Sequence, residues 1–392
     1  MSLSTRLSPH HRIFAAFAVY AFALGQIFPR FPDLKAAMGV EEGAFGLSLM
    51  GTAVGTLIAL TLSTAIAERI GHRIVLLGLI PLMSVFFAVA SFATGPLGFF
   101  LLLIPAGLTV GTIEIIINVE ADRVEAGLDR RIMNRAHAFW SFGFFGAGIF
   151  GAAMVQLGVS PQAQLISMMP LSCIAVWLFL ADFQPAPKRS SDKEETPPII
   201  ARPTGAILVL VGVSLSAMLL EGAYIDWSAI YMTEVFETAA SLGGIAVATA
   251  AVSQAIVRYY ADGFVDKFAP TNVARFMQVA MAIGVVLVFV APTPAISLIG
   301  FVFIGAGCSV MFPLAMSAAA QRTDRPAAIN VAALAQFSFV TFLLAPPLLG
   351  YVAEHFGLRW TFGVGLPLIA LSFALCGALG QSPEAKTKKA AS

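Results

Sequence analysis

Two carboxylates lie close together in a stretch that is otherwise apolar. Residues 218–232 belong to a run long enough to cross a bilayer, yet they include Glu221 and Asp226. An ionised carboxylate at the centre of a bilayer costs about 2.5–3.5 kcal/mol on insertion scales, so such groups usually have partners or face water. We therefore expect 218–232 to line a water-filled pathway where these groups bind a proton or a polar solute. The alternative for Asp226 is simple hydration at the outer interface.

A third acidic residue, Glu114, lies in another apolar run. Gly107, Gly111, Glu114 and Asn118 follow one another at steps of four, three and four residues, which places them on one face of a helix. The glycines allow a close helix crossing. Glu114 and Asn118 then continue that face as a candidate site for a proton or a solute. The alternative is that Glu114 makes a structural hydrogen bond to a neighbouring helix.

Further candidates are polar or aromatic residues within apolar segments. Arg30 could pair with Glu221, Asp226 or a substrate anion, or reach the outer interface. His137 could bind a proton, because a histidine side chain ordinarily titrates near neutral pH. The alternative is that it is only hydrated at the inner end of its helix. Trp140 and Tyr224 could stack on a ring-shaped solute, although aromatic residues in such helices more often pack or mark the interface. These candidates are Gln26, Arg30, His137, Trp140, Tyr224 and Gln336.

Composition indicates a protein that crosses a membrane many times. The 392 residues are 58% hydrophobic and only 11% charged, whereas soluble domains contain about 25% charged residues. The net charge of only +1 does not indicate a nucleic-acid-binding protein, which usually has a strongly basic surface. The three cysteines are spaced too far apart for a metal site, and no phosphate-binding loop or nucleophile constellation is seen. We expect no cofactor, no metal and no enzymatic activity.

The sequence predicts an all-α membrane protein, because twelve apolar segments each approach the ~20 residues that a helical span requires. The lipid bilayer is thus its first partner. Continuous apolar runs of this length are typical of helices rather than of barrel strands. The predicted spans are 13–31, 44–66, 74–94, 97–120, 135–158, 163–181, 204–232, 241–261, 272–291, 295–319, 327–350 and 359–380.

The basic residues predict the orientation. With the N-terminus inside, 20 of the 23 Lys and Arg residues fall in or beside cytoplasmic segments, as the positive-inside rule requires. Both termini are then cytoplasmic. The longest polar stretch, 182–203, reads as a flexible linker. It predicts an N-terminal six-helix bundle (1–181) and a C-terminal one (204–392), and weak similarity at an offset near 197 residues suggests that they are repeats.

A short charged loop follows the second span of each half. The sequence from Thr64 to Val75 resembles the signature loop of the major facilitator superfamily, with Glu68 and Arg69 in the acid and base positions. A second, degraded copy at 262–270 keeps Asp266 and Lys267. Such charges can pair across an inner gate in one conformer only, or they can merely fix the topology. The expected cytoplasmic gate comprises Glu68, Arg69, Arg73, Arg258, Asp262, Asp266 and Lys267, with Arg258 and Asp262 paired near the inner mouth.

Matches at 30–33, 118–120, 131–143 and 221–228 are similar to a bacterial inner-membrane branch near the fucose-permease-like members of that superfamily. The resemblance implies two pseudo-symmetric six-helix bundles that form a monomeric secondary transporter working by alternating access. Two departures are seen. Leu103 stands where proton-coupled members often carry arginine, and span five lacks the Gly-Pro signature of drug antiporters.

The expected activity is proton-coupled movement of a small polar solute, sugar-like or an organic acid. Burial favours the protonated form of a carboxylate, so Glu221 and Glu114 are the candidate proton carriers. One alternative is an exporter of amphipathic compounds or drugs on the same fold. Another is a non-transporting membrane sensor, whose carboxylates would all be paired in a closed interior.

Overall fold

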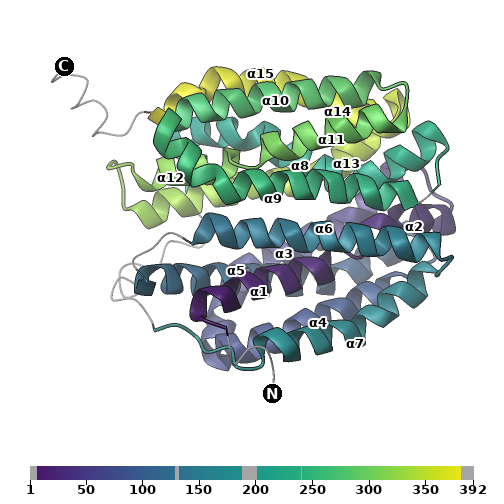
Figure 1. The fold of residues 1–392 in the computed structure, drawn as a ribbon, viewed down its shortest axis with the longest axis horizontal. Coiled ribbons are helices and arrows are strands. Elements are labelled where there is room, and N and C mark those ends of the chain that lie inside the picture. Colours follow the sequence, from purple (N-terminus) through teal and green to yellow (C-terminus); the bar gives the residue numbers. More distant parts are fainter. Residues whose placement is uncertain (1–6, 129–131, 188–200, 240, 381–392) are drawn as a thin grey trace.

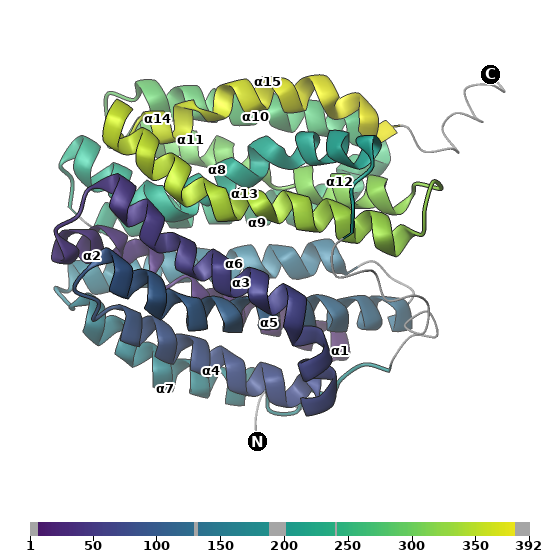
Figure 2. The ribbon, with the colours of Figure 1, turned by 180° about the vertical axis from the view of Figure 1, so that it is seen from behind.

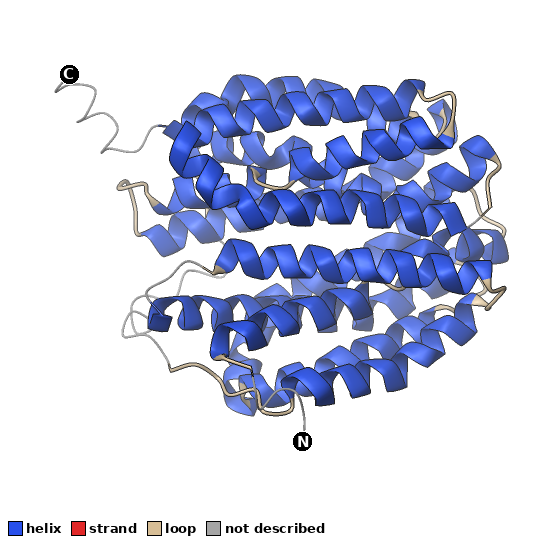
Figure 3. Cartoon of the chain, in the orientation of Figure 1, coloured by secondary structure: helices blue, strands red, loops and turns tan. Residues whose placement is uncertain are grey.

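The computed structural model describes residues 7–128, 132–187, 201–239 and 241–380, without the side chains of 60–68 and Ala328. Within that part, the chain forms helices and loops and no strand (Figure 3). Twelve helical spans are long and apolar enough to cross a membrane. The predicted all-α fold with twelve membrane-spanning helices is therefore confirmed.

The N-terminal half contains six spans, the first of which is bent. Its elements are α1 (Pro9–Leu24), η2 (Phe28–Arg30), α2 (Phe31–Met38), α3 (Glu42–Ile70), α4 (His72–Ala90), α5 (Pro96–Leu128), α6 (Met133–Gln156) and α7 (Pro161–Leu180). The first span continues seven residues beyond the predicted end at 31. The polar residues in this extension, Asp33 and Lys35, are ion-paired, which lowers the cost of placing them in the helix.

The C-terminal half repeats the six spans with two breaks. Its elements are α8 (Gly205–Phe236), α9 (Ser241–Phe268), α10 (Pro270–Val290), α11 (Pro294–Cys308), α12 (Met311–Ala320), α13 (Ala327–Phe356), α14 (Trp360–Gly363), α15 (Gly365–Leu375) and η4 (Cys376–Gly380). The predicted span 295–319 is thus interrupted between Cys308 and Met311. This interruption leaves backbone groups that need partners outside the helix.

The two charged loops have a similar backbone turn. Gly71, between α3 and α4, has φ +95°, and Ala269, between α9 and α10, has φ +64°. Positive φ is easy for glycine and strained for alanine. The second copy of the loop therefore keeps the turn of the first although its residue is less suited to it.

The halves lie side by side, each forming one bundle (Figure 1). We call the end where α1 begins and α7 ends the linker end, and the end with 39–41, 157–160 and 237–239 the opposite end. Near the opposite end, a Cβ on Gly148 of α6 would lie 2.7 Å from the Gly244 oxygen of α9. A Cβ on Gly46 of α3 would lie 3.1 Å from the Cα of Gly350 of α13. From there, α3 and α13 diverge toward the linker end (Figure 2).

Candidate functional site

Arg258 of α9 lies where three other elements meet. Its Nη2 donates to Glu221 Oε1 of α8 at 3.3 Å, and its Nε donates to the Ser309 carbonyl at 3.1 Å. The latter oxygen belongs to the break between α11 and α12. Its Nη1 donates to Ser141 Oγ of α6, in the other half, at 3.1 Å. The Arg258 and Glu221 side chains are 10% and 12% exposed, so this ion pair is largely withdrawn from solvent.

Glu114 heads a second group, in the N-terminal half. Asn118 Nδ2 donates to Glu114 Oε1 at 3.2 Å and to its carbonyl at 2.8 Å. His137 Nε2 of α6 lies 3.1 Å from Asn118 Oδ1, so this nitrogen carries a proton if the amide is oriented as stated. Tyr20 of α1 lies beside Glu114. The sequence-predicted face of α5 therefore points into the molecule.

Ser141 joins the two groups. It is fully buried, one turn after His137 on α6, and its Oγ lies 3.3 Å from the His137 carbonyl. The same Oγ lies 3.2 Å from Gln254 Oε1 of α9, which also accepts from Tyr224 Oη at 2.9 Å. We call the set Glu114, Asn118, His137, Ser141, Tyr224, Glu221, Gln254 and Arg258 the central network. It is a nearly continuous polar path between acidic residues on opposite halves.

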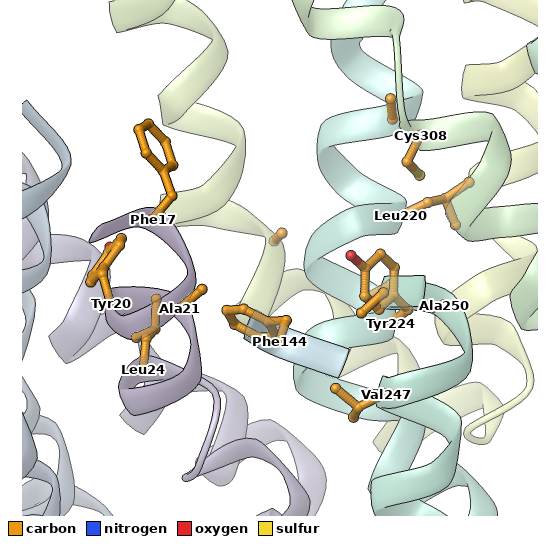
Figure 4. Packing of buried hydrophobic residues seen from close by; sticks show 14 of the residues in the cluster. Phe17, Tyr20, Ala21, Leu24, Phe144, Leu220, Tyr224, Val247, Ala250 and Cys308 are labelled. Atoms are coloured by element: carbon orange, nitrogen blue, oxygen red, sulfur yellow. The ribbon is translucent and has the colours of Figure 1, made fainter. Parts of the chain in front are cut away.

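Hydrogen-bond donors without partners lie in the central network and next to it on α6. Gln254 Nε2 and Trp140 Nε1 are buried, and neither has a hydrogen-bond partner among the described residues. A buried donor left unpaired costs about 1–3 kcal/mol, so such donors are candidates for binding a solute. Trp140 stacks on Phe144 with 4.4 Å between ring centroids. In Figure 4, Phe144 lies between Tyr20 on α1 and Tyr224 on α8.

Gln26 and Arg30 lie in a different cluster. Arg30 donates to Gln164 Oε1 of α7 at 2.6 Å, to Asp33 at 3.0 Å and to the Val159 carbonyl at 2.7 Å. Gln164 Nε2 in turn donates to Gln26 Oε1 at 2.9 Å. This buried cluster holds the bent first span against α7, within the N-terminal half. It does not bring Arg30 to Glu221 or Asp226.

Two further candidates lie outside the central network. Gln336 of α13 accepts a hydrogen bond from the Ala201 backbone at 2.9 Å, so it holds the C-terminal end of the linker segment. Asp226 of α8 is half-buried. Within the described part of the chain, no hydrogen bond or ion pair to Asp226 is seen, and it stays an isolated candidate.

The expected gate residues behave differently from one another. Asp262 accepts a hydrogen bond from Asn134 of α6, so the expected pairing of Asp262 with Arg258 is wrong. Arg258 instead lies one turn deeper, where Glu221 is its counter-ion. Three of the expected gate residues are exposed: Arg69, Asp266 and Lys267. Arg73 donates to the Ala181 carbonyl at 2.5 Å. The side chain of Glu68 is not among those that the structure describes.

One buried ion cluster was not expected from the sequence. Glu120 of α5 is fully buried; its Oε1 lies 2.5 Å from His72 Nδ1 and 3.4 Å from Arg123 Nη1. Its Oε2 accepts from the Ala186 backbone at 2.8 Å. In the sequence, His72 stands where the signature loop of the superfamily has an arginine, and Glu120 ends span four. These two residues were the available signal for the cluster. The cluster ties the start of the linker segment to α4 and α5.

A second ion cluster crosses between the halves at the opposite end. Lys35 Nζ of α2 lies 2.6 Å from Glu42 Oε1 of α3 and 2.8 Å from Glu234 Oε1 of α8. Nearby, Glu354 of α13 accepts from the Gly43 backbone at 3.0 Å, at the positive N-terminus of α3. We call the trio Lys35, Glu42 and Glu234 the lysine latch. It helps to hold the halves together at this end.

Comparison with known sequences gives consistent relatives. A family model described as Major Facilitator Superfamily matches residues 209–392. An uncharacterized MFS-type transporter of Yersinia pestis is 25% identical over 362 residues, covering 91% of this chain and 92% of its own. The uncharacterized transporter y4wD of Sinorhizobium fredii is 25% identical over 378 residues, covering 96% and 99%.

Solved structures share the fold at low sequence identity. The nucleoside transporter NupG has a TM-score of 0.69 at 15% identity, covering 95% of this chain and 98% of its own. A D-xylose-proton symporter has a TM-score of 0.69 at 13% identity, with coverage of 96% and 98%. The E. coli fucose:proton symporter has a TM-score of 0.62 at 17% identity, with coverage of 95% and 98%.

Proposed function

The chain belongs to the major facilitator superfamily, and from that premise we propose that it moves a small, uncharged, hydroxyl-bearing solute together with a proton. The observation that carries this proposal is the central network. It connects Glu114 in one half to Glu221 in the other through hydrogen bonds and one guanidinium. Alternating access requires both halves to respond to the same bound species, and this network touches both.

Charge balance supports proton binding. The central network contains two carboxylates, Glu114 and Glu221, against the single guanidinium of Arg258. With His137 neutral, one negative charge is left in excess in a largely buried region. Burial makes an uncompensated charge costly, so taking up one proton is the simplest way to neutralise the site. We infer that the two carboxylates share this proton-binding role.

The hydrogen-bonding capacity supports an uncharged solute over an organic acid. Arg258 already pairs with the Glu221 carboxylate and donates to two further protein oxygens, so its charge is balanced without an anionic ligand. Gln254 and Trp140 offer buried donors without partners, and Glu114 and Glu221 offer acceptors. Hydroxyl groups satisfy both kinds of partner. Structural neighbours named as transporters of nucleosides, xylose and fucose agree with this class.

The linker end is proposed to face the cytoplasm of a bacterial inner membrane. Most of the basic residues that the structure describes fall at this end, as the positive-inside rule requires. The contacts of the lysine latch at the opposite end, and the divergence of α3 from α13 toward the linker end (Figure 2), support an inward-facing conformer. The Asn134–Asp262 contact between α6 and α9, with the exposed charges Arg69, Asp266 and Lys267, would then form part of the inner gate.

A two-step experiment tests this function. Purified protein is first screened by thermal denaturation against sugars, nucleosides, organic acids and amphipathic drugs. We expect a sugar or nucleoside to give the largest rise in melting temperature, and uptake of that solute into proteoliposomes to increase with an inward proton gradient. If only organic acids or only amphipathic drugs stabilise the protein, the proposed class of sugar-like and nucleoside substrates is wrong. Solute uptake that does not change with the proton gradient would rule out the proposed proton coupling.

A further inference from the structure

We propose that Arg258 exchanges counter-ions during transport. In this conformer it pairs with Glu221 of its own half; once Glu221 is neutralised by a proton, Arg258 pairs instead with Glu114 of the other half and draws the halves together at the linker end. This inference rests on the proposed function, because it uses the same carboxylates, but it adds the residue that converts proton binding into movement.

The contacts of Arg258 are the first step in the argument. Of its three partners, only Glu221 carries a charge; the Ser309 carbonyl and the Ser141 hydroxyl are neutral. A guanidinium stays protonated under all physiological conditions. If Glu221 becomes neutral, Arg258 therefore remains a largely buried cation held only by dipoles, which is an unfavourable arrangement.

A replacement anion is close by. Glu114 lies near enough to interact electrostatically with both Arg258 and Glu221. Ser141, already bonded to Arg258, is one turn from His137, which joins the Glu114 group through Asn118. The other titratable groups that face these carboxylates or Arg258 are Tyr20, His137, Tyr224 and Cys308. None of them ordinarily carries a full negative charge near neutral pH, so Glu114 is the available counter-ion.

The packing of α5 explains how this exchange moves the molecule. Glu114 is on α5, which is packed tightly against α3: a Cβ on Gly107 would lie 2.0 Å from the Thr52 carbonyl, and one on Gly55 would lie 2.1 Å from the Ile104 carbonyl. The two helices therefore move as one body. Since α3 is the helix that diverges from α13 at the linker end (Figure 2), attraction between Arg258 and Glu114 brings that end together.

Distances between spin labels at the linker end test this inference without any solute. Leu128, the last residue of α5, and Gln321, which follows α12, are exposed on opposite halves. Both are changed to cysteine in a Cys173→Ser background, because Cys173 is exposed whereas Cys308 and Cys376 are buried. Double electron–electron resonance on the purified protein then gives the fractions of short and long distances as the pH is lowered.

Glu221→Gln should mimic the protonated state and raise the ratio of short to long distances at every pH, by roughly 5- to 150-fold if the coupling is of ordinary strength. Adding Glu114→Gln should cancel that rise, because the new counter-ion is gone. Ser141→Ala should reduce it, whereas Ser141→Thr, which keeps the hydroxyl, should restore it. Glu41→Gln, an exposed charge at the opposite end, is the control for loss of one carboxylate.

Two results would overturn the exchange. One is an unchanged distance distribution in Glu221→Gln; the other is an equal rise in Glu221→Gln and in the double variant. Melting temperatures of all variants show whether each is folded. Because these distances are measured without transport, their failure is separable from that of the proposed function. Solute uptake could remain proton-driven while Arg258 keeps one partner throughout.

Discussion

Glu120 illustrates at the residue scale how a buried charge is used for structure rather than for transport. Its carboxylate is fully enclosed by His72, Arg123 and the Ala186 backbone. Glu114 and Glu221, by contrast, have fewer fixed partners and lie within reach of both halves. Acidic residues in similar apolar contexts thus have different roles, and only their three-dimensional partners distinguish them.

Glu120→Ala should strongly destabilise the protein. The change leaves Arg123 without this carboxylate in a buried place and removes the acceptor of the Ala186 N–H. Breaking a buried ion pair in this way costs about 3–5 kcal/mol. Thermal denaturation of purified protein should show a clear fall in melting temperature. Glu120→Gln, which keeps an acceptor oxygen, should lose less, and equal melting temperatures for all three proteins would exclude an anchoring role.

Sequence reasoning identified the face of α5 but not the partners of the other candidates. Glu114 and Asn118 are four residues apart, and helical spacing alone brings them together. Arg30 and Gln164 are 134 residues apart and meet only through tertiary packing, which no local pattern specifies. Helical spacing places Ser141 on one face with His137, and Gln254 on one face with Arg258. The contact between Ser141 and Gln254, however, could not be predicted, for a similar reason. A serine or a glutamine in a membrane helix becomes informative only when its neighbour across the interface is known.

At the scale of elements, the turn at Ala269 carries a cost that the equivalent turn at Gly71 avoids. Alanine with φ +64° and ψ +148° occupies a region that is almost restricted to glycine, and such strain costs about 1–3 kcal/mol. The strain persists because Ala269 precedes Pro270 and begins α10. A residue that tolerates positive φ at position 269 should therefore increase the stability of the protein.

Ala269→Gly should stabilise the protein by about 1 kcal/mol, after allowing for the greater freedom of glycine in the unfolded chain. The measurement is the melting temperature of the purified variant. Gly263→Ala is a matched control on the same side of the molecule, since a Cβ there meets nothing within 4 Å. A lower melting temperature for Ala269→Gly would show that this backbone conformation is not strained.

The helices themselves were predictable, whereas their interruptions were not. Long apolar runs fix where a chain can cross a bilayer, and all twelve expected spans are helical. The break after Cys308 has only an ambiguous local signal. Pro313 has no N–H to donate to the Ser309 carbonyl four residues earlier, but Pro105 also lies inside a span and leaves its helix continuous. The break is accommodated by Arg258, which donates to the Ser309 carbonyl from a different helix. Tertiary partners thus decide where a membrane helix can open.

For the whole molecule, the balance between conformers depends on contacts at both ends. The lysine latch holds one carboxylate from each half on a single ammonium group, with Glu234 38% exposed and Glu42 12% exposed. Without that ammonium, Glu42 and Glu234 would repel each other across the interface. The charge of Lys35 therefore converts a repulsive contact between the halves into an attractive one.

Lys35→Gln should shift the population toward conformers open at the opposite end. Because Glu234 is partly exposed and solvent screens the pair, we expect a change of at most roughly fivefold, equivalent to about 1 kcal/mol. Spin labels on Leu157→Cys and Val290→Cys, both exposed at that end, would report longer distances. Adding Glu234→Gln removes the repulsion and should reverse part of the shift. Unchanged distances in Lys35→Gln would mean that helix packing alone closes this end.

The most direct test of the whole account is proton movement driven by the solute. Proteoliposomes containing a pH-sensitive dye receive the sugar or nucleoside that most stabilises the protein, without an imposed gradient. The wild-type chain should acidify the lumen as the solute enters. Glu114→Gln and Glu221→Gln should each lose that proton movement while still exchanging labelled solute across the membrane. Proton movement that persists unchanged in both variants would contradict the assignment of coupling to these two carboxylates.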